Sequence, residues 1–552
     1  MKKITSKFIA TVMCIAVSMM TLAGCGDSTE ETTNESVVTS ASQEESSSAG
    51  EEKADEGTAE YETEMHIALN SAPPTLDTMQ STEQFGRIMM YGTVYESLMT
   101  MDENYEPKEE LAESIEVNED CSEYIYHLRQ GVLFHNGQEM KAEDVAASMN
   151  RWIELYGAAA KMVGDARFEV VDDYTVKISM DKPALFLNYL IANQTQGAII
   201  VPKTAIDNQD ASTGYLTEYI GTGPYKFDEW VDDQYVKLTK FDGYVPYGTE
   251  GEMSGWCGYK AAYLQNIYFE FVPDDTTRAN GVLSGEYDMV YSLPIDSYEM
   301  FEGNTDVKIY TEPGGLPNLV FNKKDGLASN PLIRQAINYA LNADEIMQVS
   351  YANEEFYKVY SSYMPEERPL WYSEAGAEYF NQQDIEKAQE LLEKAGYNGE
   401  TFRIIVSSDY SDYVNTALTI ENQLEAIGMN VQVDTYDWAT FATLRNDETA
   451  YDGFCISPMV VPIPTMLIYL NPEWAGWTSD KYIVSTVEAI NSATSVEEAA
   501  SLWNELQEYC SKDYLPHISF GVYYSCNVAS SDLEGFEYFN GPWVVNTKVP
   551  KK

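Results

Sequence analysis

The stretch that decides the fold reads YIYHLRQGVLFHNG over residues 124–137 and AEDV over residues 142–145. Its first five residues alternate along the chain as a half-buried strand does. The Asn-Gly pair that ends the first stretch predicts a tight turn. Apolar residues then recur at helical spacing, which predicts a helix over about 142–156. The first half of the chain is therefore expected to mix strands and helices.

The second half follows a different pattern, with helices and strands alternating from about residue 312. Phe402, Ile404 and Val406 alternate as a strand, and a helix that ends at Gly428 separates them from a strand beginning at Val431. A strand–helix–strand run of this length predicts a parallel pair in an α/β sheet. The sequence thus predicts two unlike halves, the first α+β and the second α/β.

Segments along most of the chain resemble the family 5 solute-binding proteins of ABC importers, which include dipeptide-, oligopeptide- and nickel-binding receptors. The signature of that family is matched by residues 124–145, with Lys141 where a Thr or Ser cap is more usual. Other matching segments follow in the family's order: 72–77 (APPTLD), 94–98 (VYESL), 111–114 (LAES), 221–225 (GTGPY), 285–288 (GEYD), 334–340 (RQAINYA) and 388–397. Together the matches cover nearly the whole chain after residue 62.

The resemblance implies an α/β, two-lobed periplasmic-binding-protein-like fold, type II, of the large class with an extra subdomain and a ligand cleft between the lobes. The expected parts are lobe I at 62–97, 198–312 and 513–552, an extra subdomain of lobe I at 98–197, and lobe II at 313–512. Two crossings would join the lobes near 311–315 and 515–517, because Gly and Pro at the exits of sheets suit a hinge.

The N-terminus has the order of an export signal. Three lysines precede an apolar run over residues 8–22, which is shorter than the about 20 residues that a spanning helix needs. The run ends in LAGC at residues 22–25, which resembles the lipobox of bacterial lipoproteins. We therefore expect residues 1–24 to be a lipoprotein signal peptide and Cys25 to carry the lipid. An acidic, Ser/Thr-rich tether over 25–61 would hold the folded body at the extracellular face of the cell membrane.

The charge and the missing motifs narrow the function. The chain has 89 acidic and 34 basic residues, a net charge of −55, which argues against nucleic-acid binding. It has only four histidines and no HExxH, GxSxG or Gly-Lys sequence. We therefore expect no catalytic residue, no metal and no cofactor, and a secreted hydrolase is a remote alternative. A two-lobed receptor that closes on its ligand requires no reactive group.

The resemblance also suggests ligand-binding residues. Trp438 and Arg445 match positions at which peptide-binding members present an aromatic ring and an arginine to the ligand, which would allow stacking and a paired carboxylate. The alternative is a packed tryptophan and a surface arginine. Thr222 and Gly223 would bring backbone groups to the ligand or would form a structural turn. On a later loop, Trp474 and Trp477 would line the cleft or pack elsewhere.

One departure from the family affects the predicted ligand. Oligopeptide receptors hold the ammonium group of the ligand with an acid, and Val461 stands at that position here. The nearby Asp452 is expected to be structural. Unless Asp409, Glu473 or another acid reaches the cleft, the usual ammonium partner is absent.

The sequence therefore leaves several ligands open. A di- or oligopeptide is expected first, an oligosaccharide second, and a nickel ion or metal chelate last. The receptor would be a monomer that delivers its ligand to ABC transporter permease subunits.

Overall fold

The computed structural model describes residues 61–81 and 83–551. The predicted signal peptide, the lipidated Cys25 and the tether up to Glu60 lie outside the described residues. Within the described part, no helix is long and apolar enough to cross a membrane.

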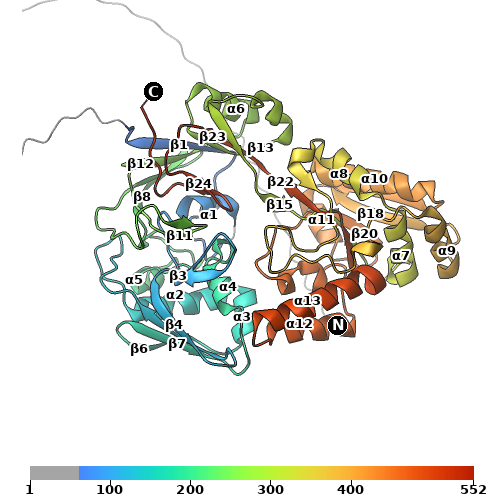
Figure 1. The fold of residues 1–552 in the computed structure, drawn as a ribbon, viewed down its shortest axis with the longest axis horizontal. Helices are drawn as coiled ribbons and strands as arrows, with labels where there is room; N and C mark the ends of the chain where they lie inside the picture. The colour runs from blue at the N-terminus through green and yellow to red at the C-terminus, as the bar shows by residue number, and fades with distance from the viewer. Residues whose placement is uncertain (1–60, 82, 552) are drawn as a thin grey trace, which may run out of the picture. The chain divides into compact units, whose positions relative to one another are not determined.

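A seven-stranded sheet, in the order β14-β23-β13-β1-β12-β9-β8, forms the centre of the first lobe, which we call lobe I (Figure 1). Its strands are β1 (Glu64–Leu69), β8 (Tyr225–Val231), β9 (Tyr235–Lys240), β12 (Asn266–Phe271), β13 (Met289–Leu293), β14 (Val307–Tyr310) and β23 (Cys526–Ser530). Strand β1 runs parallel to both β12 and β13, and α6 (Asp275–Ser284) connects these two. Residues from distant parts of the sequence thus share one sheet.

Residues 124–145, which the sequence assigns to an extra subdomain, contribute to β5 (Glu123–Leu128) and α2 (Ala142–Leu155). A four-stranded antiparallel sheet, β4-β5-β7-β6, combines β5 with β4 (Ala112–Val117), β7 (Thr175–Ser179) and β6 (Glu169–Asp172). The predicted helix is α2, which buries Val145, Met149 and Trp152. The unusual Lys141 cap is explained by Asp144, whose carboxylate accepts the Lys141 backbone N–H at 3.0 Å. This is the half of a capping box that the residue at the third helical position supplies, while the Asp144 backbone N–H donates to the Lys141 carbonyl at 3.0 Å.

Lobe II is built on a five-stranded sheet in the order β19-β18-β20-β16-β21. Its strands are β16 (Asn318–Phe321), β18 (Thr401–Ser407), β19 (Asn430–Tyr436), β20 (Gly453–Ile456) and β21 (His517–Ser519). The main helices of lobe II are α7 (Pro331–Ala340), α8 (Ala343–Tyr351), α9 (Ile385–Ala395), α10 (Ser411–Ala426), α11 (Trp438–Leu444), α12 (Lys481–Asn491) and α13 (Val496–Tyr509). Strands β18 and β19 pair in parallel on either side of α10, so the predicted α/β unit is confirmed.

The remaining helices belong to the first part of the chain, and the remaining strands form small sheets and hairpins. The helices are α1 (Gln84–Met90), α3 (Gly157–Val163), α4 (Leu187–Ala192) and α5 (Lys203–Asp207). The hairpin strands are β2 (Met99–Met101), β3 (Pro107–Glu109), β10 (Met253–Ser254), β11 (Cys257–Gly258), β24 (Glu537–Tyr538) and β25 (Pro542–Trp543).

The two crossing segments lie side by side in a small sheet, where β22 (Val522–Tyr524) pairs with β15 (Pro313–Gly315) and with β17 (Tyr357–Lys358). The segment predicted as the first crossing, near 311–315, contains β15. The segment predicted as the second crossing, near 515–517, leads into β21, which pairs with β16 and therefore belongs to the sheet of lobe II. The boundary predicted at residue 513 is thus too early. Pro516 directly precedes β21, an edge strand of this sheet, which is a position that proline tolerates.

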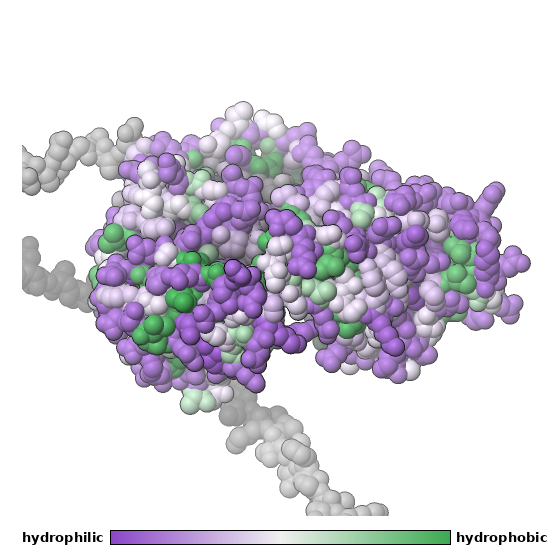
Figure 2. Space-filling view, turned by 60° about the horizontal axis from the view of Figure 1, so that its bottom comes forward, coloured by the Kyte–Doolittle hydropathy of each residue, from purple (hydrophilic) through white to green (hydrophobic). Residues whose placement is uncertain are grey.

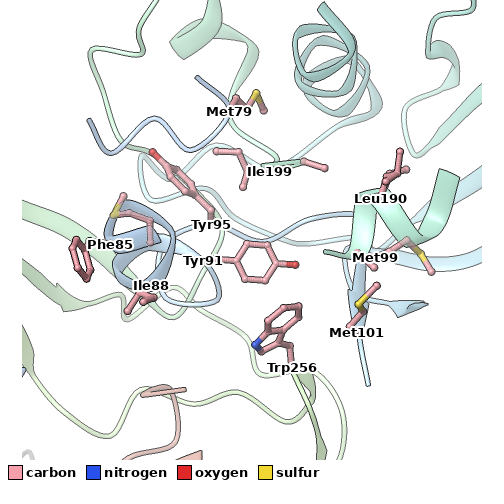
Figure 3. Packing of buried hydrophobic residues seen from close by; sticks show 14 of the residues in the cluster. Met79, Phe85, Ile88, Tyr91, Tyr95, Met99, Met101, Leu190, Ile199 and Trp256 are labelled. Atoms are coloured by element: carbon pink, nitrogen blue, oxygen red, sulfur yellow. The ribbon is translucent and has the colours of Figure 1, made fainter. Parts of the chain in front are cut away.

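Aromatic, aliphatic and methionine side chains pack together around α1 in the hydrophobic core (Figure 3). The rings of Tyr91 and Trp256 lie 5.8 Å apart, and the Trp256 indole N–H donates to the carbonyl of Phe539 at 2.8 Å. Both rings are almost fully buried. Burial and one directed hydrogen bond thus fix the orientation of Trp256.

The outer surface carries no large apolar patch on the face shown in Figure 2. Hydrophobic residues there form small, separate patches within a mostly hydrophilic surface. Isolated apolar residues of this kind are normal on a soluble protein and do not mark a docking surface. The interior cavities are therefore the better place to look for a binding site.

Candidate binding site

The main candidate site is a cavity of about 650 Å³ lined by residues of lobe I, of lobe II and of the crossing segments. Lobe I contributes Arg87, Tyr291 and Glu312, among others, and lobe II contributes Arg368 and the segment 410–413. The volume falls within the range of about 300–1,000 Å³ that small-ligand sites occupy. A cavity bounded by both lobes is what a receptor that closes on a small solute requires.

Asp412 is an acidic group in the wall of this cavity. It lies in the first turn of α10, where its Oδ2 accepts a hydrogen bond from the Tyr351 hydroxyl at 3.0 Å. Burial raises the pKa of its carboxyl above the usual value. In the described part of the chain no basic side chain forms an ion pair with it. A half-buried carboxylate with no cationic partner is suited to receive a cation from a ligand.

A second acid, Glu312, is held differently. Its Oε1 accepts hydrogen bonds from the hydroxyls of Tyr291 at 2.6 Å and Tyr538 at 3.0 Å. Burial raises the pKa of Glu312, while these hydrogen bonds and the charges of Arg87 and Arg368 lower it. Because neighbouring groups already satisfy Glu312, it is a weaker candidate for ligand contact than Asp412.

Tyrosine rings cover much of the wall. Tyr351 stacks on Tyr523 with centroids 5.0 Å apart, and Tyr410 stacks on Tyr413 at 4.7 Å. Tyr523 lies on crossing strand β22, where its ring packs directly over Gly314 of the first crossing. A Cβ atom at Gly314 would lie 2.3 Å from that ring, so this position requires glycine. The rings offer flat apolar faces and hydroxyl donors to a ligand.

Three of the ten described non-glycine residues with positive φ line the cavity. Ser292, Ala352 and Asn540 line it with φ values of +57°, +58° and +50°, although none of them is glycine. A left-handed backbone costs a residue with a side chain roughly 1 kcal/mol or more and persists where the surroundings enforce it. Strain of this kind gathers at ligand sites, which supports the assignment of the cavity.

The structure brings together three of the residues predicted from sequence, but not on the wall of this cavity. The Arg445 guanidinium lies 5.7 Å from the Trp438 ring and 5.4 Å from the Trp474 ring. Trp438 is 39% exposed, and its ring lies 5.5 Å from that of the cavity residue Tyr410. The cluster therefore adjoins the cavity through Tyr410, and its role in binding stays a prediction.

The other three predicted residues do not line this cavity. Trp477 adjoins the cluster, since its backbone N–H donates to the carbonyl of Trp474 at 2.8 Å. Thr222 is buried and donates a hydrogen bond to Glu96 at 2.9 Å, facing a separate cavity of about 260 Å³. Gly223 packs so closely against the carbonyl of Thr93 that a Cβ would lie 2.2 Å from it. Trp477 stacks on Tyr451. These contacts are those of a structural turn and of ordinary packing.

The acids considered from the sequence also have structural partners. Asp452 accepts the backbone N–H groups of Leu327 at 2.6 Å and Arg403 at 2.9 Å, as expected of a structural residue. Asp409 accepts the backbone N–H of Trp438 at 2.9 Å. Neither Val461 nor Glu473 lines the cavity. The acid that does reach it from lobe II is Asp412, which the sequence reasoning missed.

A signal for Asp412 was present in the sequence. The run Tyr410-Ser411-Asp412-Tyr413 follows strand β18 almost directly, and ligands of open α/β sheets bind beyond the carboxyl ends of the strands. No comparable signal marks Arg368, which lies in a segment with neither helix nor strand periodicity.

Two further features of the described residues concern possible metal ligands and the state of the cysteines. Over 61–81 and 83–551, no three His, Cys, Asp or Glu side chains are grouped so that they could hold a metal ion. The five cysteines in this range, at positions 121, 257, 455, 510 and 526, are free thiols.

Comparison with known proteins gives the context of this geometry. Residues 106–459, more than half of the chain, match the middle region of the bacterial extracellular solute-binding proteins, family 5. A probable peptide ABC transporter periplasmic-binding protein, y4tO of Sinorhizobium fredii, is 24% identical over 468 residues, which are 80% of this chain and 85% of that protein. The glutathione-binding protein GsiB of Shigella flexneri is 27% identical over 380 residues, 67% of this chain and 69% of that protein.

A solved structure supports the fold. The periplasmic binding protein AgaA of A. tumefaciens R10, in complex with agropinic acid, has a TM-score of 0.71 at 24% sequence identity. The alignment covers 89% of this chain and 99% of that one. The two-lobed fold of periplasmic binding proteins is therefore shared.

Proposed function

Because this chain belongs to the family 5 bacterial extracellular solute-binding proteins, we propose that it captures a short peptide and delivers it to an ABC importer. The relatives y4tO and GsiB carry names that refer to peptide and to glutathione. The observation that carries the proposal is Asp412, a carboxylate in the cavity wall without a cationic partner. Asp412 would pair with the ammonium group of the ligand, the role of the acid that oligopeptide receptors carry at the position of Val461.

The cavity volume favours a short ligand. About 650 Å³ accommodates a molecule of drug-like size, and an ammonium group fixed at Asp412 would place the peptide against the tyrosine pairs. Tyrosine faces also suit an oligosaccharide, which is the second candidate. A neutral sugar would leave the charge of Asp412 without a partner, so the peptide is preferred.

Peptide affinity should depend on pH through Asp412. Burial raises its pKa in the free protein, and only the ionised carboxylate pairs with an ammonium group. Affinity should therefore be highest near neutral pH and should fall as the pH drops through the raised pKa, by about tenfold per unit below it. Calorimetric titration of tri-alanine between pH 7.5 and pH 4 measures this.

The control for the pH dependence is N-acetylated tri-alanine, which has no ammonium group. Its affinity should be weaker and should lack the acidic limb. If tri-alanine binds equally well at pH 4 and pH 7, or if the acetylated peptide shows the same fall, Asp412 does not hold the ammonium group.

We further propose that Cys25 anchors the protein to the outer face of the membrane. The support is the lipobox-like LAGC at residues 22–25 after a basic and then apolar leader. In a Gram-positive host, Cys25→Ala should move most of the protein from the membrane fraction into the culture medium. Immunoblotting of the two fractions measures the shift. Retention of the Cys25→Ala protein in the membrane would show that the anchor is misassigned. The matched cysteine control is Cys14→Ala, which should stay in the membrane fraction like the wild type.

A further inference from the structure

Arg368 stands at the wall between the main cavity and a second one. Its side chain is 5% exposed, and it lines both the cavity of about 650 Å³ and a neighbouring cavity of about 510 Å³. Trp371 and Tyr189 line the second cavity as well. Arg368 is therefore shared by the linings of both cavities.

The hydrogen-bonding capacity of Arg368 is almost unused. A guanidinium has five N–H donors, and Arg368 uses few of them: Nη1 donates to the carbonyl of Glu367 at 3.4 Å, and the Tyr105 hydroxyl interacts with the guanidinium. Its buried Nε has no hydrogen-bond partner. In the described part of the chain no carboxylate forms an ion pair with it. Buried cations are normally paired, so this arrangement indicates a partner that comes from outside the chain.

The nearby acids are engaged with other groups. Glu312 accepts two tyrosine hydroxyls, and Oε1 of Glu367 accepts the Tyr524 hydroxyl at 2.7 Å. Burial lowers the pKa of Arg368, whereas the Tyr105 hydroxyl, Glu367 and Glu312 raise it. An arginine side chain stays protonated in proteins, so Arg368 keeps its positive charge at neutral and acidic pH.

A strained aromatic residue holds the guanidinium in place. The centre of the Arg368 guanidinium lies 3.3 Å from the centroid of the Tyr105 ring. Tyr105 has φ = +61°, in a turn where the carboxylate of Asp102 accepts the backbone N–H groups of Asn104 and Glu106, both at 2.9 Å. Stacking on a ring covers one face of a guanidinium and leaves its N–H edges available for an anion.

We propose that Arg368 is an anion-binding subsite that recognises a carboxylate of the captured ligand. The inference rests on the proposed function and extends it, since it limits the substrate class to peptides that carry a carboxylate at this end. The planar edge of a guanidinium matches a carboxylate bidentately. The carboxylate can be the peptide C-terminus or an acidic side chain, and the test separates these two sources.

The test compares matched peptides on the same protein by calorimetry at pH 7. The probes are tri-alanine, tri-alanine amide, and an amidated tripeptide whose last residue is Glu. Wild type should bind tri-alanine at least tenfold more tightly than its amide. Arg368→Gln should bind both with similar, weak affinity, and Arg368→Lys should retain part of the preference. If wild type binds the amidated tripeptide that ends in Glu more tightly than tri-alanine amide, the subsite also accepts side-chain carboxylates.

Two other arginine variants serve as controls. One tests whether the loss of a positive charge alone changes the preference, and the other tests the arginine that the sequence predicts to bind the carboxylate. Arg403→Gln removes the same charge from lobe II, where Arg403 donates to the carbonyl of Thr449 outside the cavity, and it should keep the wild-type preference. Arg445→Gln tests the rival arginine. Because each result is a ratio of two peptides on one sample, a partly misfolded fraction does not change it.

The outcomes separate this inference from the proposed function. If wild type binds tri-alanine and Arg368→Gln keeps the same acid-to-amide ratio, the anion subsite is wrong and peptide binding stands. Loss of the preference in Arg445→Gln instead of Arg368→Gln also overturns it. If wild type binds none of the peptides, the proposed function fails and this inference fails with it.

Discussion

Replacing Asp77 with alanine should lower the free energy of unfolding by about 3–5 kcal/mol. Asp77 is fully buried, and its two carboxylate oxygens accept hydrogen bonds from Arg151 at 3.1 and 2.6 Å. The backbone N–H of Leu216 donates to the same carboxylate at 2.9 Å. The change leaves a buried guanidinium of α2 without its counter-charge, so the connection between α2 and the N-terminal part of lobe I weakens.

Urea unfolding followed by tryptophan fluorescence measures this loss. The control is Asp207→Ala, which removes an exposed pair with Lys203 and should cost less than about 1 kcal/mol. The double variant Asp77→Ala/Arg151→Met should be more stable than Asp77→Ala alone, because no unpaired buried charge remains. Equal stability of Asp77→Ala and wild type would mean that the pair contributes little to the native state.

Replacing Asp412 with asparagine should weaken the binding of tri-alanine by about 2 kcal/mol, roughly 30-fold. The amide keeps the shape of the side chain and its contact with the Tyr351 hydroxyl but removes the negative charge that the ammonium group needs. The loss should nearly disappear for N-acetylated tri-alanine, which has no positive charge to pair with the carboxylate.

The matched control for Asp412 is Asp409→Asn, a removal of the same charge from an exposed position three residues earlier that does not line the cavity. It should leave the affinity for tri-alanine within about twofold of wild type. If Asp412→Asn and Asp409→Asn have equal effects, the overall negative charge of the protein is responsible and not a specific contact.

Much of the fold could be predicted because it follows local patterns. The alternation over 124–128 and the helical spacing that follows it are properties of neighbouring residues, and they appear as β5 and α2. Asp384 and Gly396 mark the ends of α9 because capping is also local. The second crossing was misplaced because the pairing of β21 with β16 joins residues about 200 positions apart, which no local pattern reports.

The binding site could be predicted only in part, for a related reason. The aromatic and arginine motif at Trp438 and Arg445 is visible in the sequence, and the structure places it beside the cavity. The cavity wall itself combines short segments from distant parts of the chain, such as Glu312, Arg368 and Asp412. Arg368 and Asp412 are of interest because neither has an oppositely charged partner in the described part of the chain. That can be recognised only when the surroundings of each side chain are known.

The central claim is that the cavity between the two lobes binds an intact short peptide through charges at its two ends. Native mass spectrometry of the protein, after incubation with equal concentrations of tri-alanine, its acetylated and amidated forms, and a neutral trisaccharide, tests this most directly. We expect the adduct with unmodified tri-alanine to be more abundant than the adducts with the acetylated peptide, the amidated peptide and the trisaccharide. An adduct with the trisaccharide and none with any peptide would contradict this claim.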